Sequence, residues 1–263
     1  MTTPMEARPM RNITAIAQRE LNAYFASPIG YVLIGFFALL FGHFFYVSLW
    51  FFERQSMQMG MNPTQSLNMN QMLIGPALMN TTVIMLFLFP LVTMRTYSEE
   101  KRSGTIELLL TSPITDIQII LGKFFGAMTL YAAMLAVTLI HIGLLFVYGT
   151  PEWKPIVTAY LGLLLMGGSF LSLGLFISSL TKNQIVAAMA TFAAFLMLWV
   201  ISWMSSMFGP TASAVLQYLS IVEHFDDFAK GVIDTKHVIY YVSFMALGLF
   251  LTVKSVDSER WRG

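Results

Sequence analysis

Charged and apolar side chains occur together in one short segment of this 263-residue chain, residues 94–127. Its first part carries the charged run Glu99, Glu100, Lys101 and Arg102. After Gly104 come Thr105, Ile106, Glu107, Leu108, Leu109 and Leu110. Charged groups pair with a partner surface, and exposed leucines are unfavourable in water unless something covers them. These residue types indicate a docking surface for a partner protein. The alternative is that the apolar side chains lie in a membrane interface or against the rest of the chain.

The residues needed for several kinds of catalysis are missing. The Gly122-Lys123 pair is followed by Phe124 and lacks the glycine that a Walker A phosphate loop requires five residues earlier. HExxH and GxSxG motifs are absent, and the chain has no cysteine, which excludes disulfides, thiolate metal ligands and a cysteine nucleophile. We therefore predict no enzymatic activity, no cofactor and no metal ion in this chain.

The composition predicts an all-α integral membrane protein. Hydrophobic residues make up 56% of the chain and charged residues only 11%, against about 25% charged in a soluble domain. Charge-free stretches long enough to cross a bilayer as helices recur along the sequence. Gly209 and Pro210 end one stretch that is too long for a single span. Six spans in one domain, 1–263, are predicted at about 29–51, 73–94, 120–148, 156–180, 185–208 and 237–254.

The positions of the basic residues predict the orientation. Lysine and arginine near span ends are retained on the cytoplasmic side. With a cytoplasmic N-terminus, only Arg54, Lys154, Lys230 and Lys236 of the 15 basic residues lie outside. Both termini are therefore predicted to be cytoplasmic. The net charge of +1, without a separate basic patch, gives no indication of nucleic-acid binding, and no cleavage site of a signal peptide precedes the first span.

An amphipathic helix is predicted over residues 11–26. Ile13, Ala17, Leu21 and Tyr24 recur at helical spacing, with polar residues on the other faces. Such a helix lies along the lipid interface, here on the inner side of the membrane. Ser27, Pro28 and Gly30 then allow the chain to turn into the first span.

The segment after the second span is predicted to be helix, break, short helix and helix. Gly104 can take the left-handed conformation that ends a helix, and a short helix follows over 106–110. Thr115 and Gln118 fit a capping box, so the third membrane helix is predicted to begin at Asp116 and to enter the bilayer past Lys123. Small residues at four-residue spacing, Gly122 with Gly126 and Gly168 with Ser172, predict close helix packing.

The charge-free stretches also indicate what kind of energy source would drive transport. Secondary transporters commonly place ionisable groups or broken helices at mid-membrane, and the sequence indicates neither. Energy supplied from outside the bilayer is favoured. Two other readings stay open: a secondary transporter or channel, and a membrane scaffold that transports nothing.

Five segments carry a resemblance to a known family. They are FASPIGY over 25–31, MRTYSEEKRSGTIELLLTSPI over 94–114, LGKFFGA over 121–127, LTKNQIVA over 180–187 and GVIDTKHVIYYVS over 231–243. With these segments the chain resembles the membrane permeases of the type-2 ABC exporter superfamily, most closely the gliding-motility-associated branch. The resemblance covers nearly the whole length, and the second segment is its most specific motif.

The resemblance implies a six-helix permease in the bacterial cytoplasmic membrane. It implies a dimer with a second copy or a related permease, and two cytoplasmic ATPase subunits that bind ATP and Mg²⁺. Residues 106–110 then correspond to a coupling helix, and the helix over 11–26 to a connecting helix. The implied contacts with the ATPase are Glu99, Glu100, Lys101, Arg102, Thr105, Ile106, Glu107, Leu108, Leu109 and Leu110.

Two segments on the predicted outer side carry further hypotheses. In the resembling family, the region between the last two spans caps the exit path. This makes Glu223, Phe225, Asp226, Asp227 and Phe228 candidates for an outer gate or for contacts with an extracytoplasmic accessory protein, with a structural cap as the alternative. In the first outer loop, the thioethers of Met57, Met59 and Met61 are soft ligands that favour copper(I), although a flexible apolar lid would use the same residues.

Overall fold

The structure is a computed structural model that describes residues 9–59, 68–110, 114–205 and 207–260. These residues form helices and turns, with no strand among them. The helices are α1 (Pro9–Ala26), α2 (Ile29–Met59), the π-helical turn η1 (Asn70–Ile74), α3 (Gly75–Met79), α4 (Thr81–Thr93), α5 (Ser98–Ser103), α6 (Thr105–Leu110), α7 (Asp116–Tyr148), α8 (Trp153–Ser179), α9 (Gln184–Ser205), α10 (Pro210–Leu219), α11 (Glu223–Ala229) and α12 (Thr235–Arg260).

Six segments of the described chain are long and apolar enough to cross a membrane. They are Ile29–Gln58, Asn70–Ser103, Asp116–Tyr148, Trp153–Ser179, Gln184–Met204 and Thr235–Glu259. The predicted all-α fold with six spanning helices is confirmed at this level. The protein is a multi-pass membrane protein.

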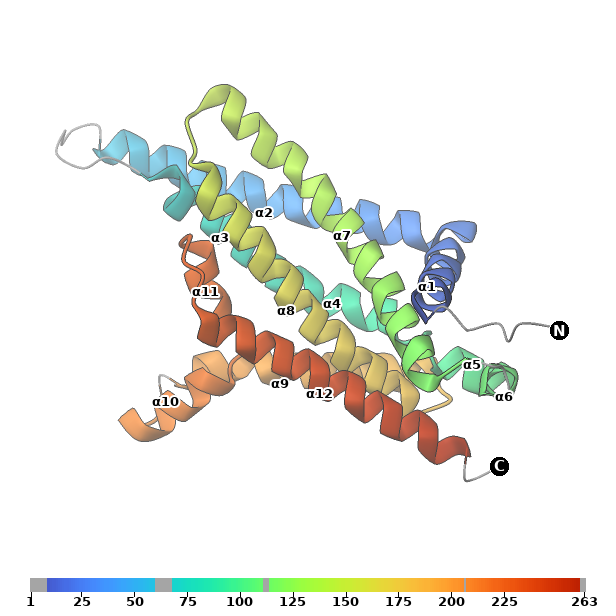
Figure 1. Ribbon diagram of the computed structural model, residues 1–263. Coiled ribbons are helices and arrows are strands. Elements are labelled where there is room, and N and C mark those ends of the chain that lie inside the picture. The colour runs from blue at the N-terminus through green and yellow to red at the C-terminus, as the bar shows by residue number, and fades with distance from the viewer. Residues whose placement is uncertain (1–8, 60–67, 111–113, 206, 261–263) are drawn as a thin grey trace.

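The helices form a bundle with distinct ends. In Figure 1, α8 crosses the centre of the bundle, with α7 on one side of it and α12 on the other. The short helices α5 and α6 lie at one end, together with α1 and the last turns of α12, whereas α11 lies at the opposite end, beside the start of α8. The first and last described helices therefore reach the same end.

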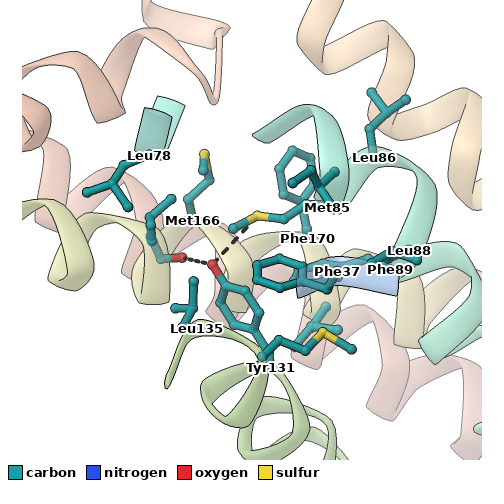
Figure 2. Packing of buried hydrophobic residues seen from close by; sticks show 14 of the residues in the cluster. Phe37, Leu78, Met85, Leu86, Leu88, Phe89, Tyr131, Leu135, Met166 and Phe170 are labelled. Atoms are coloured by element: carbon teal, nitrogen blue, oxygen red, sulfur yellow. Dashed lines mark hydrogen bonds between the residues drawn. The ribbon is translucent and has the colours of Figure 1, made fainter. Parts of the chain in front are cut away.

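Tyr131 of α7 lies in the centre of the core (Figure 2). Its hydroxyl donates a hydrogen bond of 3.0 Å to the carbonyl oxygen of Leu163 on α8 and lies 3.7 Å from the sulfur of Met85 on α4. The ring of Phe89 meets it edge-on, with 4.9 Å between the centroids. A Cβ on Gly167 would lie 2.2 Å from the Tyr131 ring, so only glycine leaves room for this ring against α8. The helices α4, α7 and α8 therefore meet in the core around the Tyr131 hydroxyl, which has a hydrogen-bond partner.

Small residues bring α8 and α12 into close contact. A Cβ on Gly168 would lie 2.5 Å from the sulfur of Met245, and one on Gly248 would lie 2.6 Å from Oγ of Ser172. The close packing predicted for Gly168 and Ser172 is confirmed. Within a membrane, such spacing lets backbones approach and increases dispersion contacts.

The second span is less regular than the sequence indicated. It begins with the π-helical turn η1, continues as α3, turns at Asn80 and resumes as α4. Pro76 and Pro90 each lack the backbone N–H that a continuous helix uses, which accounts for part of the irregularity. The prediction that no span is broken was wrong here, so only the scarcity of charged residues in the spans still disfavours a secondary transporter.

The segment between the second and third spans follows the predicted order of helices. Gly104 has φ +73°, so α5 ends in the left-handed conformation that glycine favours. The helix α7 begins at Asp116. The predicted capping box was wrong: Thr115 makes no side-chain cap hydrogen bond, and the Gln118 side chain instead accepts a 3.1 Å hydrogen bond from Asn12 of α1.

Candidate functional site

The end of the bundle that holds α5 and α6 contains a buried lysine, Lys123 of α7. Its side chain is 1% exposed. The ammonium nitrogen donates hydrogen bonds to Glu20 of α1 at 3.0 Å, to Glu100 of α5 at 2.8 Å and to the Thr96 carbonyl oxygen at 3.0 Å. Arg19 adds a second cation, 2.9 Å from Glu20 and 3.3 Å from Glu100. Two cations and two carboxylates from three helices therefore balance one another.

The electrostatics of this cluster favour its ionised form. Burial alone would raise the pKa of Glu20, but Lys123 and Arg19 outweigh that effect, so the pKa of Glu20 is lowered. Burial likewise acts to lower the pKa of Arg19, and the carboxylates of Glu20 and Glu100 reverse the direction, so the pKa of Arg19 is raised. We refer to Arg19, Glu20, Glu100 and Lys123 as the charged junction.

The glycines next to Lys123 form the surface on which α1 packs. A Cβ on Gly122 would lie 2.6 Å from Cβ of Ile16, and one on Gly126 would lie 2.8 Å from Cβ of Glu20. The predicted close packing is confirmed, and the partner is the N-terminal helix itself. The short distance between the helices also lets Glu20 reach Lys123.

Two further contacts connect α5 to the rest of the bundle. Lys101 has a 3% exposed side chain and pairs with Glu259 of α12 at 2.7 Å. The backbone N–H groups of Tyr97 and Ser98 donate to Oγ of Ser178 at the end of α8, at 3.2 and 3.3 Å. The start of α5 is therefore fixed to α8 and α12 as well as to α7 and α1.

The predicted docking residues fall into three groups. Glu100, Lys101 and Ile106 are directed into this chain, and Ile106 is 8% exposed. Four residues remain at the surface, namely Glu99, Arg102, Thr105 and Glu107. The side chains of Leu108, Leu109 and Leu110 lie outside the described residues, although their backbone completes α6. The surface available to a partner is thus narrower than the sequence predicted.

The opposite end is held by two phenylalanines of α11. Phe225 and Phe228 are fully buried, and a Cβ on Gly162 of α8 would lie 2.7 Å from Phe228 and 3.0 Å from Phe225. The hydroxyl of Thr158 donates a 3.0 Å hydrogen bond to the Phe228 carbonyl oxygen. These rings pack α11 against α8, and the outer gate, the partner contact and the structural cap all stay predictions.

The acidic residues of α11 have partners within the chain. Glu223 accepts a 2.8 Å hydrogen bond from Ser202 of α9, Asp226 pairs with Lys230, and Asp227 lies 2.8 Å from Nε2 of His237. Asp227, Asp234 and His237 offer ligand atoms within 4.8 Å of one another, the arrangement of a small cation site. Asp234 also accepts from the backbone N–H of Lys236 at the start of α12, so each of the three side chains has at least one contact within the chain.

The methionines of the copper hypothesis are described only in part. Met57 is exposed near the end of α2, the side chain of Met59 lies outside the described residues, and Met61 lies outside them altogether. The copper hypothesis stays a prediction.

Comparison with known families now adds to this geometry. The family model described as "ABC-2 family transporter protein" matches residues 14–253, almost the whole chain. The chain belongs to the ABC-2 transporter family. It is therefore a membrane permease subunit of an ABC transporter, a transport component of the kind that is usually not the ATPase itself.

Two curated relatives of this permease carry the same description, "Probable multidrug ABC transporter permease YbhR". They come from Escherichia coli strain K12 and Escherichia coli O157:H7, and each is 30% identical over 146 residues. The match covers 54% of the permease and 39% of each relative. The aligned part of the permease thus spans well under half of the length of these relatives.

Lys123 is the functional residue that sequence reasoning missed. The sequence analysis assigned it no partners, whereas the structure buries it among carboxylates from α1 and α5. A signal was present in the sequence: a single lysine in a long apolar helix requires carboxylates nearby, and Glu20 and Glu100 border the neighbouring spans.

Proposed function

We propose that this permease transmits the movement of a cytoplasmic ABC ATPase to its membrane helices through α6, α5 and the charged junction. The observation that carries the proposal is the burial of Lys123 between Glu20 and Glu100. Because Glu100 is on α5, a displacement of α6 and α5 changes the contacts of α1 and α7 together. The exposed residues Glu99, Arg102 and Glu107 supply polar contacts beside α6.

In this proposal the end that holds α1, α5 and α6 faces the bacterial cytoplasm. The positions of the basic residues support this orientation. Two copies, or one copy and a related permease, form the transport unit with two ATPase subunits that bind ATP and Mg²⁺. The direction is export, or the mechanical driving of an extracytoplasmic protein as in the gliding-motility branch, and α11 acts as a cap on the outer side.

Docking on α6 is tested with the double variant Leu108→Asp and Leu109→Asp. Placing two carboxylates in an apolar interface costs about 2 to 5 kcal/mol, so recovery of the ATPase with the tagged permease from native membranes should fall at least tenfold. The matched control is Val215→Asp with Leu219→Asp on exposed α10 at the opposite end, which should leave recovery unchanged. Equal recovery with both double variants would refute docking on α6.

A second measurement separates this function from the alternatives. The wild-type permease and the co-purified ATPase are placed in liposomes, and spectroscopic probes on α11 are followed with and without ATP. An ATP-dependent signal supports the proposal. Solute or ion flux by the permease alone, without ATP, would identify a secondary transporter or channel, and a docked ATPase with neither flux nor signal would identify a scaffold.

A further inference from the structure

A cavity of about 750 Å³ lies beside the charged junction. Its wall is formed by α1, the start of α2, α4, the turn before α5, α5 itself, and single residues of α6 and α7. It is therefore located where the apolar spans end and the charged helices begin. In a membrane this is the depth of the lipid headgroups.

The positive and negative side chains of the wall are equal in number, but some of their hydrogen-bonding atoms have no partner in the described part of the chain. Three cationic and three anionic side chains line the cavity, namely Arg19, Arg95, Lys123, Glu20, Glu99 and Glu100. Lys123 is engaged with Glu20 and Glu100 away from solvent. Arg95 and Glu99 are different: they are 39% and 46% exposed and share one ion pair, in which Arg95 uses only Nε, at 2.8 Å.

The guanidinium groups suit one kind of ligand. Among the described residues, the two terminal nitrogens of Arg95 have no partner, and Arg19, with a 54% exposed side chain, uses one terminal nitrogen for both of its carboxylates. Two guanidinium groups with free N–H donors on one wall match the oxygens of a phosphate group. A phosphate alone would leave the cavity with a net negative charge, whereas a headgroup with its own ammonium would keep it neutral.

The remaining wall is apolar. Leu91 of α4 is 43% exposed, and Ile29 and Ala23 line the same cavity. Tyr24 also lies here, and its hydroxyl is used in a 3.0 Å hydrogen bond to the Val92 carbonyl oxygen, so it presents ring surface. A soluble phosphate compound has no use for this surface, but the first carbons of an acyl chain do.

We propose that this cavity binds one phospholipid whose headgroup carries a primary ammonium, of the phosphatidylethanolamine type. The phosphate lies between Arg19 and Arg95, the ammonium donates to Glu99, and the acyl chain leaves along Leu91 and Ile29. A choline headgroup has no N–H to donate to Glu99, and a glycerol headgroup has no cation. The site therefore selects one headgroup among lipids with the same chains.

Native mass spectrometry of the delipidated, full-length permease tests this selection. Phosphatidylethanolamine, phosphatidylcholine and phosphatidylglycerol with identical acyl chains are added in equal amounts. We expect one ethanolamine lipid per chain to be retained at least fivefold over the others. Arg95→Gln and Glu99→Gln should abolish the preference, and Arg102→Gln, an exposed residue of α5 outside the cavity, should preserve it.

A variant that fills the cavity serves as a control for altered folding of the charge variants. Ala23→Trp places an indole in the cavity without changing any charge, and it should reduce retention while the thermal midpoint stays within a few degrees of wild type. Equal retention of the three lipids would overturn the proposal, because the site would then bind phospholipids irrespective of the headgroup. Competition by soluble phosphoethanolamine as effective as by the lipid would also overturn it, in favour of a free phosphate compound. The measurement contains no ATPase, so its failure leaves the docking proposal unaffected.

Discussion

The end of the bundle that carries α1, α5 and α6 is held by buried ion pairs beside a cavity, whereas α11 at the opposite end is held by aromatic rings against glycine. Ion pairs depend on the positions of several helices at once: Lys123 loses a partner when either α1 or α5 moves. The rings of Phe225 and Phe228 contact α8, and they hold as long as α11 and α8 move together. In the function proposed above, movement would therefore enter at the charged junction, and α11 and α8 would move together.

The largest expected effect tests the charged junction. Lys123→Met leaves the two carboxylates of Glu20 and Glu100 with Arg19 as their one remaining cation in the junction, and we expect the free energy of unfolding in detergent to fall by about 3 to 5 kcal/mol. Adding Glu100→Gln should restore most of the loss, because Arg19 then pairs with Glu20 and the charges of the junction balance again. The control Lys254→Met, at an exposed position of α12, should have little effect. A loss below about 1 kcal/mol for Lys123→Met would show that the junction does not hold this end.

The next largest expected effect tests the packing of α11 through its phenylalanine rings. Phe228→Ala removes a fully buried ring, and a Phe→Ala change of this kind costs about 3 kcal/mol or more. Hydrogen exchange should therefore accelerate across α11 and in the facing turns of α8, while α1 and α5 keep their protection. Phe250→Ala, at an exposed site of α12, serves as control. Faster exchange in α1 would contradict the independence of the two ends.

A pH effect is expected from the same end. Burial, together with the neighbouring His237 and Lys236 side chains, lowers the pKa of His224 to about 4. The unfolded chain takes up this proton near pH 6.5, so the unfolded state binds more protons between the two values and stability falls as pH decreases from 6.5 to 4. The groups that face His224 are Tyr218, Asp227, Lys236, His237, Tyr240 and Tyr241.

The size of this effect is about 2 to 3 kcal/mol, measured as the pH dependence of the unfolding midpoint. The variant His224→Gln should flatten that part of the profile and leave the stability at pH 7.5 close to wild type. An unchanged slope between pH 6.5 and 4 in the variant would assign the pH dependence to other groups.

The smallest expected effect tests the packing of α1 on α7. A methyl group on Gly122 would lie 2.6 Å from Ile16, so Gly122→Ala must shift α1 and should cost about 1 to 3 kcal/mol. Gly143→Ala, on the same helix α7 with nothing within 4 Å of the new methyl, is the matched control and should be neutral or slightly stabilising. Equal stability of the two variants would mean that α1 does not depend on this surface.

The parts of the fold that were predictable from sequence were set by local patterns. Charge-free stretches gave the six spans, and Gly104 gave the end of α5, because both depend on residues adjacent in the chain. The partners of Lys123 were not predictable in this way, since many pairings of acids and bases satisfy the same composition. Gln118 illustrates the limit: its spacing from Thr115 fits a local cap, but a hydrogen bond to Asn12, 106 residues away, takes its place.

The structure of α11 was predictable from the sequence only in part. Phe225 and Phe228 are three residues apart and share one face of α11, whereas Asp226 and Asp227 lie between them. Helical spacing alone could have separated buried anchors from exposed acids. The packing of those rings on Gly162 could not have been foreseen, because glycine in a membrane helix has many uses.

The separation of Glu20 from Lys123 by 103 residues has a consequence for biosynthesis. During translation α1 is made before α7, when neither its glycine surface on α7 nor the Lys123 ammonium that pairs with Glu20 is present. Until the third span is inserted, α1 lacks its packing surface on α7 and has only the lipid interface and its contacts with earlier elements, such as Val92 of α4. Its final docking therefore marks the moment at which the first half of the permease is assembled.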